Sequence, residues 1–482
     1  MSEGKGTQLP EDRRASIAVD LGAESCRVSL LRWRDSSPQI ELVHRFGNGP
    51  VQRQDGLHWP LEQIVEGVEE GLRMAAGLAP EGVRSIAVDG WAVDYVRLND
   101  DGVPLAEPFC YRDERNVRAE TDLHKKIPAA RLREITGVQK LSINTVYQLY
   151  ADREAGYAPS RWLNLPEYML ARLGGAPVAE FTNATHSQMI DMQSRQWSEE
   201  IFREAGLKLE LAPKIVPPGT RLGKVSGRLK ELRAFQDTEL IAPACHDTAS
   251  AIAGIPALGE DWAYISSGTW SLVGALTAHP VDSPAARADN FTNLGAVGGA
   301  NCFHKNVNGM WLLKQCENAW AERGYTPGVV ELLRCCEGIA APKTLLDVDD
   351  PDLLLMGEMP QRINRQLRAK GAELLDESPE GAPQMVALIM HSLASRYAEV
   401  LARVEQHTGK KLQRLFVVGG GSRNALLNRL TAEKTGLEVC CGSAESSTVG
   451  NFAVQLATLE SSASPASSEF AAEVYRWASL LS

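Results

Sequence analysis

Short apolar runs bounded by turn residues predict a series of strands along this 482-residue chain. The first run, residues 16–20, is followed by a small-residue turn at 21–25 and an alternating strand that ends at Trp33, which together predict a β-hairpin. A similar strand, turn and strand recur at 263–273. Two such hairpins half a chain apart indicate a duplicated domain, with two turns of exposed backbone N–H groups facing each other across a cleft.

The pentapeptide Ser-Ile-Ala-Val-Asp occurs twice, at 16–20 and at 85–89. Both copies have the apolar character of a buried strand, and both end in an acid. Ligands of open α/β sheets bind at the carboxyl ends of the strands. We therefore expect Asp20, Asp89 and the nearby Asp94 to line one cleft.

The stretch from 240 to 256 predicts a buried strand that delivers Asp247 to the start of a short helix. Asp247 or Thr248 is a preferred N-cap residue, and Gly254 is expected to end the helix. The positive end of a helix dipole lowers the pKa of a carboxyl group, so Asp247 is expected to stay ionised. Such a carboxylate accepts a proton from an alcohol that attacks a phosphoryl group. The same pattern is also typical of a simple helix cap.

Residues 121–235 are helical and irregular in pattern, which indicates an elaboration of the first half beside the substrate. Residues 384–407 have the periodicity of a core helix. This helix leads to a strand at 415–418, a glycine turn at 419–421 and a further helix. Glycines between a strand and a helix allow the backbone to approach a nucleotide closely.

The end of the chain predicts a second turn at 442–450, a helix at 451–459, a Ser-rich loop and a last helix at 471–481. We expect the last helix to pack on the first lobe. The sequence contains neither G-x-G-x-x-G nor G-x-x-x-x-G-K-[ST]. These absences argue against a dinucleotide-dependent oxidoreductase and against a P-loop kinase.

Composition narrows the function classes further. A hydrophobic fraction of 44% and a charged fraction of 23% are ordinary for a soluble globular protein, and the net charge of −11 argues against a nucleic-acid partner. Residues 1–14 are polar and have the pattern of neither a signal peptide nor a membrane segment. We therefore expect no membrane partner. The nine cysteines are odd in number and contain no C-x-x-C, so we expect reduced thiols in the cytoplasm.

Taken in order, these motifs resemble the FGGY family of carbohydrate kinases over nearly the whole chain. The matching strings are Asp20 to Arg27, Asp89 to Asp94, Tyr111-Arg112-Asp113, His246 to Ser250, Ser266 to Trp270, Lys305 to Trp311, and Gly419-Gly420-Gly421 with Asn424. The resemblance implies an α/β fold of the actin, hexokinase and Hsp70 type, with two duplicated, ribonuclease H-like lobes and a cleft between them. The expected boundaries are 12–253 for the N-terminal domain, 254–459 for the C-terminal domain and 460–482 for the final loop and helix.

The resemblance also implies a role for each matching residue. Asp247 corresponds to the catalytic base, and Asp20 to the acid that holds Mg²⁺. The residues expected to bind the sugar are Ala92, His246, Asp247, Thr248 and Asn306. The residues expected to bind the co-substrate ATP are Ala23, Glu24, Ser25, Cys26, Arg27, Thr269, Lys314 and Gly420.

The reaction so implied transfers the γ-phosphoryl group of ATP to O1 of a ketose, by a monomer or a homodimer. L-Rhamnulose is expected ahead of L-fuculose or xylulose, with Trp91 as an apolar wall for its methyl group. The chain departs from the family pattern at Cys26 and Ala92, which replace Gly, at Gly90, which replaces Thr, and at Lys314, which replaces Gln. A Cβ at position 92 narrows the sugar pocket. The alternative is a non-catalytic nucleotide-binding protein of the same fold, which would need no carboxylate at 247.

Overall fold

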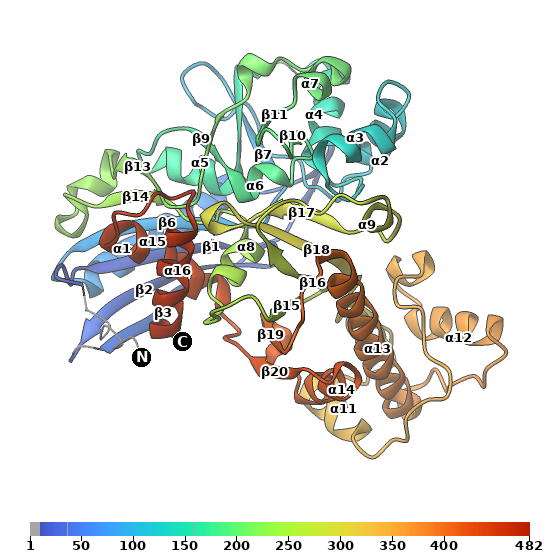
Figure 1. Cartoon of the computed structure of the whole chain (residues 1–482). Helices are drawn as coiled ribbons and strands as arrows, with labels where there is room; N and C mark the ends of the chain where they lie inside the picture. The colour runs from blue at the N-terminus through green and yellow to red at the C-terminus, as the bar shows by residue number, and fades with distance from the viewer. Residues whose placement is uncertain (1–9, 36, 158) are drawn as a thin grey trace.

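The computed structural model describes residues 10–482 except 36 and 158, and it contains two six-stranded sheets (Figure 1). The first sheet has the order β13 (Thr220–Lys224), β14 (Glu239–Ala242), β6 (Val83–Gly90), β1 (Ala15–Leu21), β2 (Ser25–Arg34) and β3 (Ser37–Gly47). The second has the order β17 (Thr292–Gly295), β18 (Asn301–Asn308), β16 (Trp270–Thr277), β15 (Trp262–Ser267), β19 (Arg414–Val418) and β20 (Glu438–Cys441). Each sheet belongs to one lobe.

Five strands of each sheet share one topology. In the first lobe, β2 runs antiparallel to both β1 and β3, and β6 and β14 continue the sheet on the other side of β1, parallel to it. In the second lobe, β15, β16 and β18 repeat the antiparallel part, and β19 and β20 repeat the parallel part. The predicted hairpins and the duplicated α/β fold are therefore confirmed.

The two copies of the repeated pentapeptide pair with each other. β1 and β6 are parallel neighbours, and their register places Ser16 beside Ser85 and Asp20 beside Asp89. Two acids consequently lie side by side near the carboxyl ends of adjacent strands, at the same edge of the first sheet. The hairpin partner of Asp20 is Arg27, which supplies a positive charge at that edge.

Helices and short strands between β3 and β13 elaborate the first lobe, and the pattern of residues 121–235 predicts only those that lie from residue 121 onward. The strands are β4 (Val51–Arg53), β5 (Gly56–His58), β7 (Tyr95–Leu98), β8 (Arg161–Asn164), β9 (Val178–Glu180), β10 (Ile190–Asp191), β11 (Gln196–Trp197) and β12 (Lys214–Val216). The helices are α1 (Leu61–Leu78), α2 (Arg115–Leu123), α3 (Ala129–Thr136), α4 (Thr145–Glu154), α5 (Leu165–Arg172), α6 (Phe181–Thr185) and α7 (Glu199–Ala205). α1 packs on β1, β2 and β3, while most of the later elements lie in the upper part of the view in Figure 1.

The second lobe is built around the expected core helix, which spans Ala382–Thr408 (α13) and packs against β16 and β18. Its other helices are α9 (Pro284–Ala288), α10 (Trp311–Ala321), α11 (Val329–Cys336), α12 (Met359–Ala369) and α14 (Ala425–Thr435). α14 follows the glycine turn, as predicted. Between the lobes lies α8 (Asp247–Ala253), which ends at Gly254 as expected.

The last two helices return to the first sheet. α15 (Ser446–Glu460) packs against α8, β1 and β6, and α16 (Ser468–Leu481) packs against α15 and β3. The predicted turn at 442–450 is wrong from Ser446 onward, because these residues are helical. A Cβ at Gly450 would overlap the carbonyl oxygen of Ser250, so this glycine allows α15 to approach α8 closely.

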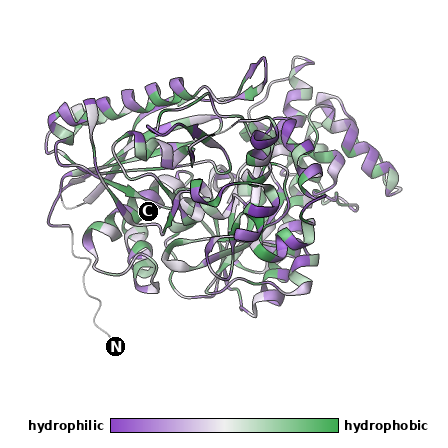
Figure 2. Cartoon of the chain, turned by 90° about the horizontal axis from the view of Figure 1, so that it is seen from above, coloured by the Kyte–Doolittle hydropathy of each residue, from purple (hydrophilic) through white to green (hydrophobic). Residues whose placement is uncertain are grey.

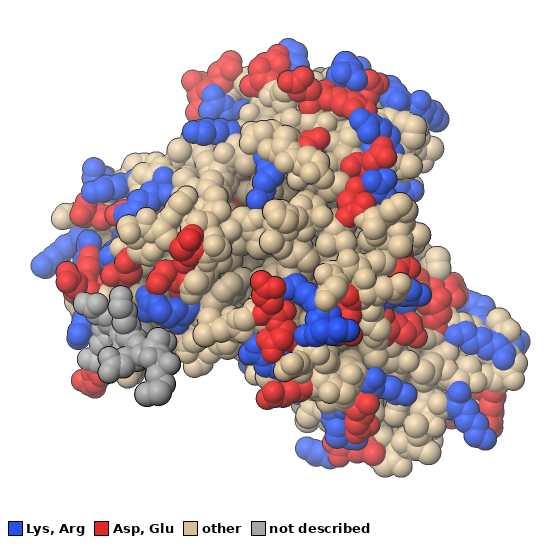
Figure 3. Space-filling model, viewed as in Figure 1, with Lys and Arg blue, Asp and Glu red and all other residues tan. Residues whose placement is uncertain are grey.

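Figures 2 and 3 show how hydrophilic and charged residues are distributed over the molecule. Peripheral helices alternate between hydrophilic and hydrophobic residues in Figure 2, as expected where one side of a helix packs on a core. Basic and acidic side chains are interspersed on the face in Figure 3. Among the helices of residues 10–482 that the structure describes, none is long and apolar enough to cross a membrane.

Candidate active site

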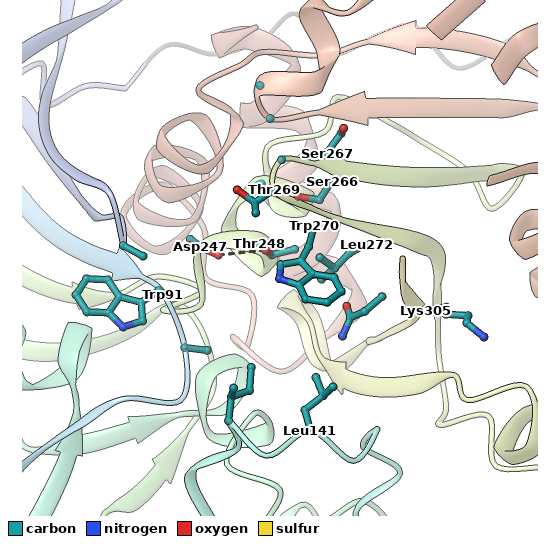
Figure 4. Close-up of a pocket in the computed structure, with 18 of the residues that line it drawn as sticks. Trp91, Leu141, Asp247, Thr248, Ser266, Ser267, Thr269, Trp270, Leu272 and Lys305 are labelled. Carbon is teal, nitrogen blue, oxygen red and sulfur yellow. Dashed lines mark hydrogen bonds between the residues drawn. The ribbon is translucent and has the colours of Figure 1, made fainter. Parts of the chain in front are cut away.

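A cleft of about 1490 Å³ is lined by residues of both lobes. Figure 4 shows Asp247 and Thr248 at the start of α8, with Thr269 and the turn of the second hairpin beside them. Of the residues expected at the site, those that line the cleft are Asp20, Ala23, Glu24, Arg27, Ala92, His246, Asp247, Thr248, Thr269, Asn306 and Gly420. Residues from distant parts of the sequence thus meet in one place, and their individual roles stay predictions.

Ser25, Cys26 and Lys314 lie elsewhere. The side chain of Cys26 is buried in the core of the first lobe, and its thiol lies 3.8 Å from the carbonyl oxygen of Gly22, to which it donates. The departure from Gly at this position therefore adds no side chain to the cleft. Lys314 extends into solvent, with 65% of its side chain exposed and Glu317 3.9 Å away. The expected contacts of these three residues with ATP stay predictions.

Asp247 is the first residue of α8, and His246 occupies the N-cap position that the sequence assigned to Asp247 or Thr248. The hydroxyl of Thr248 donates to Oδ1 of Asp247 at 3.1 Å, and Nε2 of His246 lies 3.4 Å from the same oxygen. Burial, and after it the negative charge of Asp20, raises the pKa of Asp247 to about 7. The expected lowering of this pKa is therefore wrong. The cost of partly removing the carboxylate from water, together with the charge of Asp20, outweighs the helix terminus and the hydroxyl.

Asp20 is the penultimate residue of β1 and is 5% exposed. Its Oδ2 accepts hydrogen bonds from Nη1 of Arg27 at 3.3 Å and from the hydroxyl of Ser447 at 2.9 Å. Both donors reach the same oxygen, and within the described residues no hydrogen bond is formed to Oδ1. Burial raises the pKa of Asp20, although Arg27 opposes the shift. One carboxylate oxygen therefore remains for a cation or a water at the cleft wall.

The expectation that Asp89 and Asp94 also line the cleft is wrong. Asp89 is fully buried behind it and accepts hydrogen bonds from Ser250 at 2.8 Å and from Asn451 at 2.9 Å. It therefore joins β6 to α8 and α15. Asp94 is also fully buried, and its Oδ2 accepts from the indole N–H groups of Trp59 at 2.5 Å and Trp91 at 2.9 Å.

Asp94 thereby orients two aromatic rings that do line the cleft. The ring centroids of Trp59 and Trp91 are 4.4 Å apart, and both residues are nearly buried. Sequence reasoning singled out Trp91 but missed Trp59, Leu141, Ile143 and Trp270, which also line the cleft. No local pattern distinguishes these side chains from ordinary core residues.

A segment from 180 to 186 holds the residues that precede Asp247, and we call it the brace segment. Oε2 of Glu180 accepts a hydrogen bond from the backbone N–H of Cys245 at 2.8 Å. The hydroxyl oxygen of Thr182 accepts one from the backbone N–H of His246 at 3.3 Å. Nε2 of His186 lies 3.0 Å from Nδ1 of His246. The sequence analysis missed the brace segment, because its residues give no indication that they contact residues some sixty positions later in the chain.

The glycine turn after β19 lies against the turn of the second hairpin. A Cβ at Gly421 would overlap the hydroxyl of Ser267, and Gly419 has a φ of 78°, which favours glycine. Gly420 lines the cleft, and a Cβ there would meet open space. The two turns and Arg27 therefore leave room for an anionic ligand beside exposed backbone.

Comparison with known proteins agrees with this geometry. The model of the N-terminal domain of the FGGY family of carbohydrate kinases matches residues 15–254, and that of its C-terminal domain matches residues 263–459. A rhamnulokinase of Bacteroides thetaiotaomicron is 33% identical over 447 residues, which cover 92% of this chain and 90% of that protein. A rhamnulokinase of Enterococcus faecalis is 36% identical over 456 residues, which cover 92% and 89%.

Solved structures share the fold at lower identity. A ligand-bound xylulose kinase from Lactobacillus acidophilus superposes with a TM-score of 0.76 at 15% identity, covering 97% of this chain and 96% of that one. A glycerol kinase from Plasmodium falciparum with ADP superposes with a TM-score of 0.70 at 13% identity, covering 93% and 90%. The two family models span almost the whole chain, so this protein belongs to the FGGY family of carbohydrate kinases.

Proposed function

We propose that this carbohydrate kinase transfers the γ-phosphoryl group of ATP to the O1 hydroxyl of L-rhamnulose, giving L-rhamnulose 1-phosphate and ADP. The observation that carries the chemistry is the carboxylate of Asp247, which lies in the cleft with a pKa raised to about 7, among turns of both lobes. The observation that favours this sugar is the similarity to curated rhamnulokinases over about nine tenths of the chain.

In this mechanism Asp247 is the general base that accepts the proton of the attacking hydroxyl. A base is most effective when its pKa lies near the working pH, and a pKa of about 7 meets that condition. The transition state of phosphoryl transfer is loose, so positioning and charge neutralisation contribute more than base strength. Arg27 and residues of both hairpin turns line the cleft, which supports a role for them in binding the phosphates.

Asp20 fits a role in holding Mg²⁺. Its unbonded carboxylate oxygen and its place beside Arg27 suit an ion that binds one or two carboxylates, several waters and substrate phosphates. When bound, Mg²⁺ neutralises the charge that develops on the phosphates. Ser447 and Arg27 keep the carboxylate of Asp20 in place while leaving Oδ1 for the metal or its water.

The cleft wall near Ala92 supports a 6-deoxy sugar. Trp59 and Trp91 are in contact with each other and line the cleft, as do Leu141 and Ile143, so apolar surface is present for a methyl group. An apolar pocket rejects an added hydroxyl only modestly, by roughly 10²-fold. We therefore expect 6-hydroxy analogues to be used slowly.

We place the reaction in the cytoplasm, with the protein as a monomer or homodimer. All nine cysteines are free thiols, which is consistent with a reducing compartment. Cys335 and Cys336 are neighbours in the sequence, as are Cys440 and Cys441, and none of the four forms a disulfide.

A coupled ADP-release assay tests the proposal. We expect kcat/KM to be highest for L-rhamnulose in a panel with L-fuculose, L-xylulose, D-xylulose and glycerol. A tenfold preference for another member would overturn the sugar assignment and leave the kinase chemistry standing. If no sugar raises ADP release above the background ATPase rate, the non-catalytic nucleotide-binding alternative replaces the proposal.

A further inference from the structure

The imidazole rings of His186 and His246 are in direct contact at the edge of the cleft. Nε2 of His186 lies 3.0 Å from Nδ1 of His246, and the ring centroids are 3.9 Å apart. His186 follows α6 in the brace segment, whereas His246 immediately precedes Asp247. A contact this short between two ring nitrogens requires that one of them carries a proton and the other accepts it.

We expect both rings to be neutral at physiological pH, because burial disfavours the charged imidazolium. Burial lowers the pKa of His246 to about 3 and that of His186 well below its usual value. His304, a third buried histidine, lowers the pKa of His246 further and is itself shifted to about 3. Each ring of the pair therefore carries a single proton, and only two arrangements satisfy their contact.

The surroundings of His246 distinguish these arrangements. Its second nitrogen, Nε2, lies 3.4 Å from Oδ1 of Asp247. If His246 donated through Nδ1, a lone pair on Nε2 would face the carboxylate of Asp247, which is unfavourable whenever Asp247 is ionised, the state in which it can act as a base. If His246 accepts at Nδ1, its proton sits on Nε2 and faces the carboxylate instead. The second arrangement satisfies the hydrogen bond between the two rings and places an N–H rather than a lone pair 3.4 Å from the carboxylate.

We propose that His186 is a positioning residue that donates its Nε2–H to Nδ1 of His246 and so fixes the proton of His246 on Nε2. The imidazole then presents an N–H to the Asp247 carboxylate and to oxygens of a bound ligand beside it. His186 therefore affects the reaction only through the orientation and proton of His246. The expected effect on kcat rests on the proposed kinase function, whereas the position of the proton on His246 does not.

The proton position can be measured in the substrate-free protein by two-bond ¹H–¹⁵N spectra of ¹⁵N-histidine-labelled enzyme. Spectra of His246→Gln identify the signal of His246. His124 is an internal reference for the opposite tautomer, because its Nδ1 lies 3.1 Å from the carbonyl oxygen of Ile127 and its Nε2 lies 3.0 Å from the Tyr147 hydroxyl. We expect the Nε2–H pattern for His246, and a mixture of tautomers in His186→Phe.

Two variants separate donation from ring shape. His186→Phe keeps a planar ring but removes the donor, and we expect kcat to fall about tenfold, the scale of one lost hydrogen bond, with KM for ATP within about twofold. His186→Gln supplies an amide N–H, and we expect it to restore most of kcat and the Nε2–H tautomer. His391→Phe, on α13 beside a separate small pocket, is the matched control and should behave as wild type.

An Nδ1–H tautomer of His246 in the wild-type protein would overturn the proposal. So would a Phe variant with an unchanged tautomer, or a Gln variant no more active than the Phe variant. The rates are compared on whichever ketose the wild-type enzyme uses best. A failure of L-rhamnulose as substrate is thus distinguished from a failure of the histidine pair.

Discussion

Glu180 accepts a hydrogen bond from the backbone N–H of Cys245, two residues before the proposed base, at 2.8 Å. The acid is fully buried, and so is Glu167, which accepts from the backbone N–H of Glu180 at 3.1 Å. Burial raises the pKa of Glu180 to about 7, and burial together with the charge of Glu180 raises that of Glu167 to about 8. The support of the active site therefore depends on two carboxyl groups that resist ionisation.

This pair predicts that stability falls with rising pH. The folded-state pKa of Glu167, about 8, exceeds the value of about 4.3 for an unfolded Glu. Between these values the folded protein binds the extra proton, so the free energy of unfolding decreases as pH rises. One such group changes it by about 1.4 kcal/mol per pH unit at most.

Glu167→Gln removes this proton, so we expect a flatter dependence of unfolding free energy on pH between about 5.5 and 8. The Asn183 amide, which donates to Glu167 at 2.9 Å and has a buried Oδ1 without a partner in the described residues, can rotate to accept from the new amide. Denaturant titrations across this range measure the slope. Glu66→Gln, at an exposed position of α1, is the control, and identical slopes in both variants would contradict the prediction.

Asp247→Asn should lower kcat by roughly 10²-fold or more while leaving the KM values for sugar and ATP close to wild type, because only proton transfer is lost. Steady-state kinetics on the best ketose measure both constants. Asp261→Asn is a control at a surface ion pair with Arg414 and should retain wild-type kcat. Wild-type activity in the Asp247→Asn enzyme would remove Asp247 from the mechanism.

The raised pKa of Asp247 predicts the pH dependence of the rate. A general base must be deprotonated, so kcat should rise with pH through about 7 and then level off. One unit below that pKa, the rate should be about tenfold below its plateau. A profile that stays flat from about pH 5.5 to 8.5 would show that another group accepts the proton.

Asp20→Ala should raise the Mg²⁺ concentration needed for half-maximal activity, and Asp20→Asn should do the same with less change of shape. Loss of a group that supports a metal typically costs roughly 10- to 100-fold. Ser447→Ala is the matched control, because it removes only a hydrogen bond to Oδ2 and should have a smaller effect. Wild-type Mg²⁺ dependence in both Asp20 variants would refute the assignment.

Ala92→Gly should broaden sugar acceptance. Ala92 is 8% exposed and lines the cleft, so losing its Cβ enlarges the pocket next to Trp91. We expect the preference for L-rhamnulose over 6-hydroxy ketoses to drop by about tenfold, as kcat/KM ratios would show. Ala76→Gly, on α1 and away from the cleft, is the control: it measures how far an Ala→Gly change alone affects kcat/KM through stability. An unchanged ratio would indicate that position 92 does not shape the pocket.

The sequence predicts those features of the site that are local. The hairpin turns, the helix that begins at Asp247 and the glycine turn at 419–421 each follow from a few neighbouring residues. The pKa of Asp247 does not, because its direction is decided by burial and by Asp20, which arrives from the first strand. The helix terminus considered alone therefore predicts a pKa shift of the wrong sign for Asp247.

Buried polar partners explain the other differences. Asp89 has the pattern of a cleft residue, yet Ser250 and Asn451 enclose it from two helices that follow much later in the chain. Gly450 has the pattern of a turn, yet it marks where α15 meets α8. Both outcomes depend on which elements pack together, and composition along a single segment does not contain that information.

The return of α15 and α16 to the first sheet has a consequence for synthesis. Phe470, Val474 and Trp477 are buried with Ala18 and Leu31, and Gln455 donates to the carbonyl oxygen of Ile17 at 3.1 Å. The strands at the start of the chain thus leave the ribosome long before the helices that cover one of their faces. Until translation ends, that face is open to chaperones or to misassociation, and a nascent chain stopped before residue 446 lacks its cover.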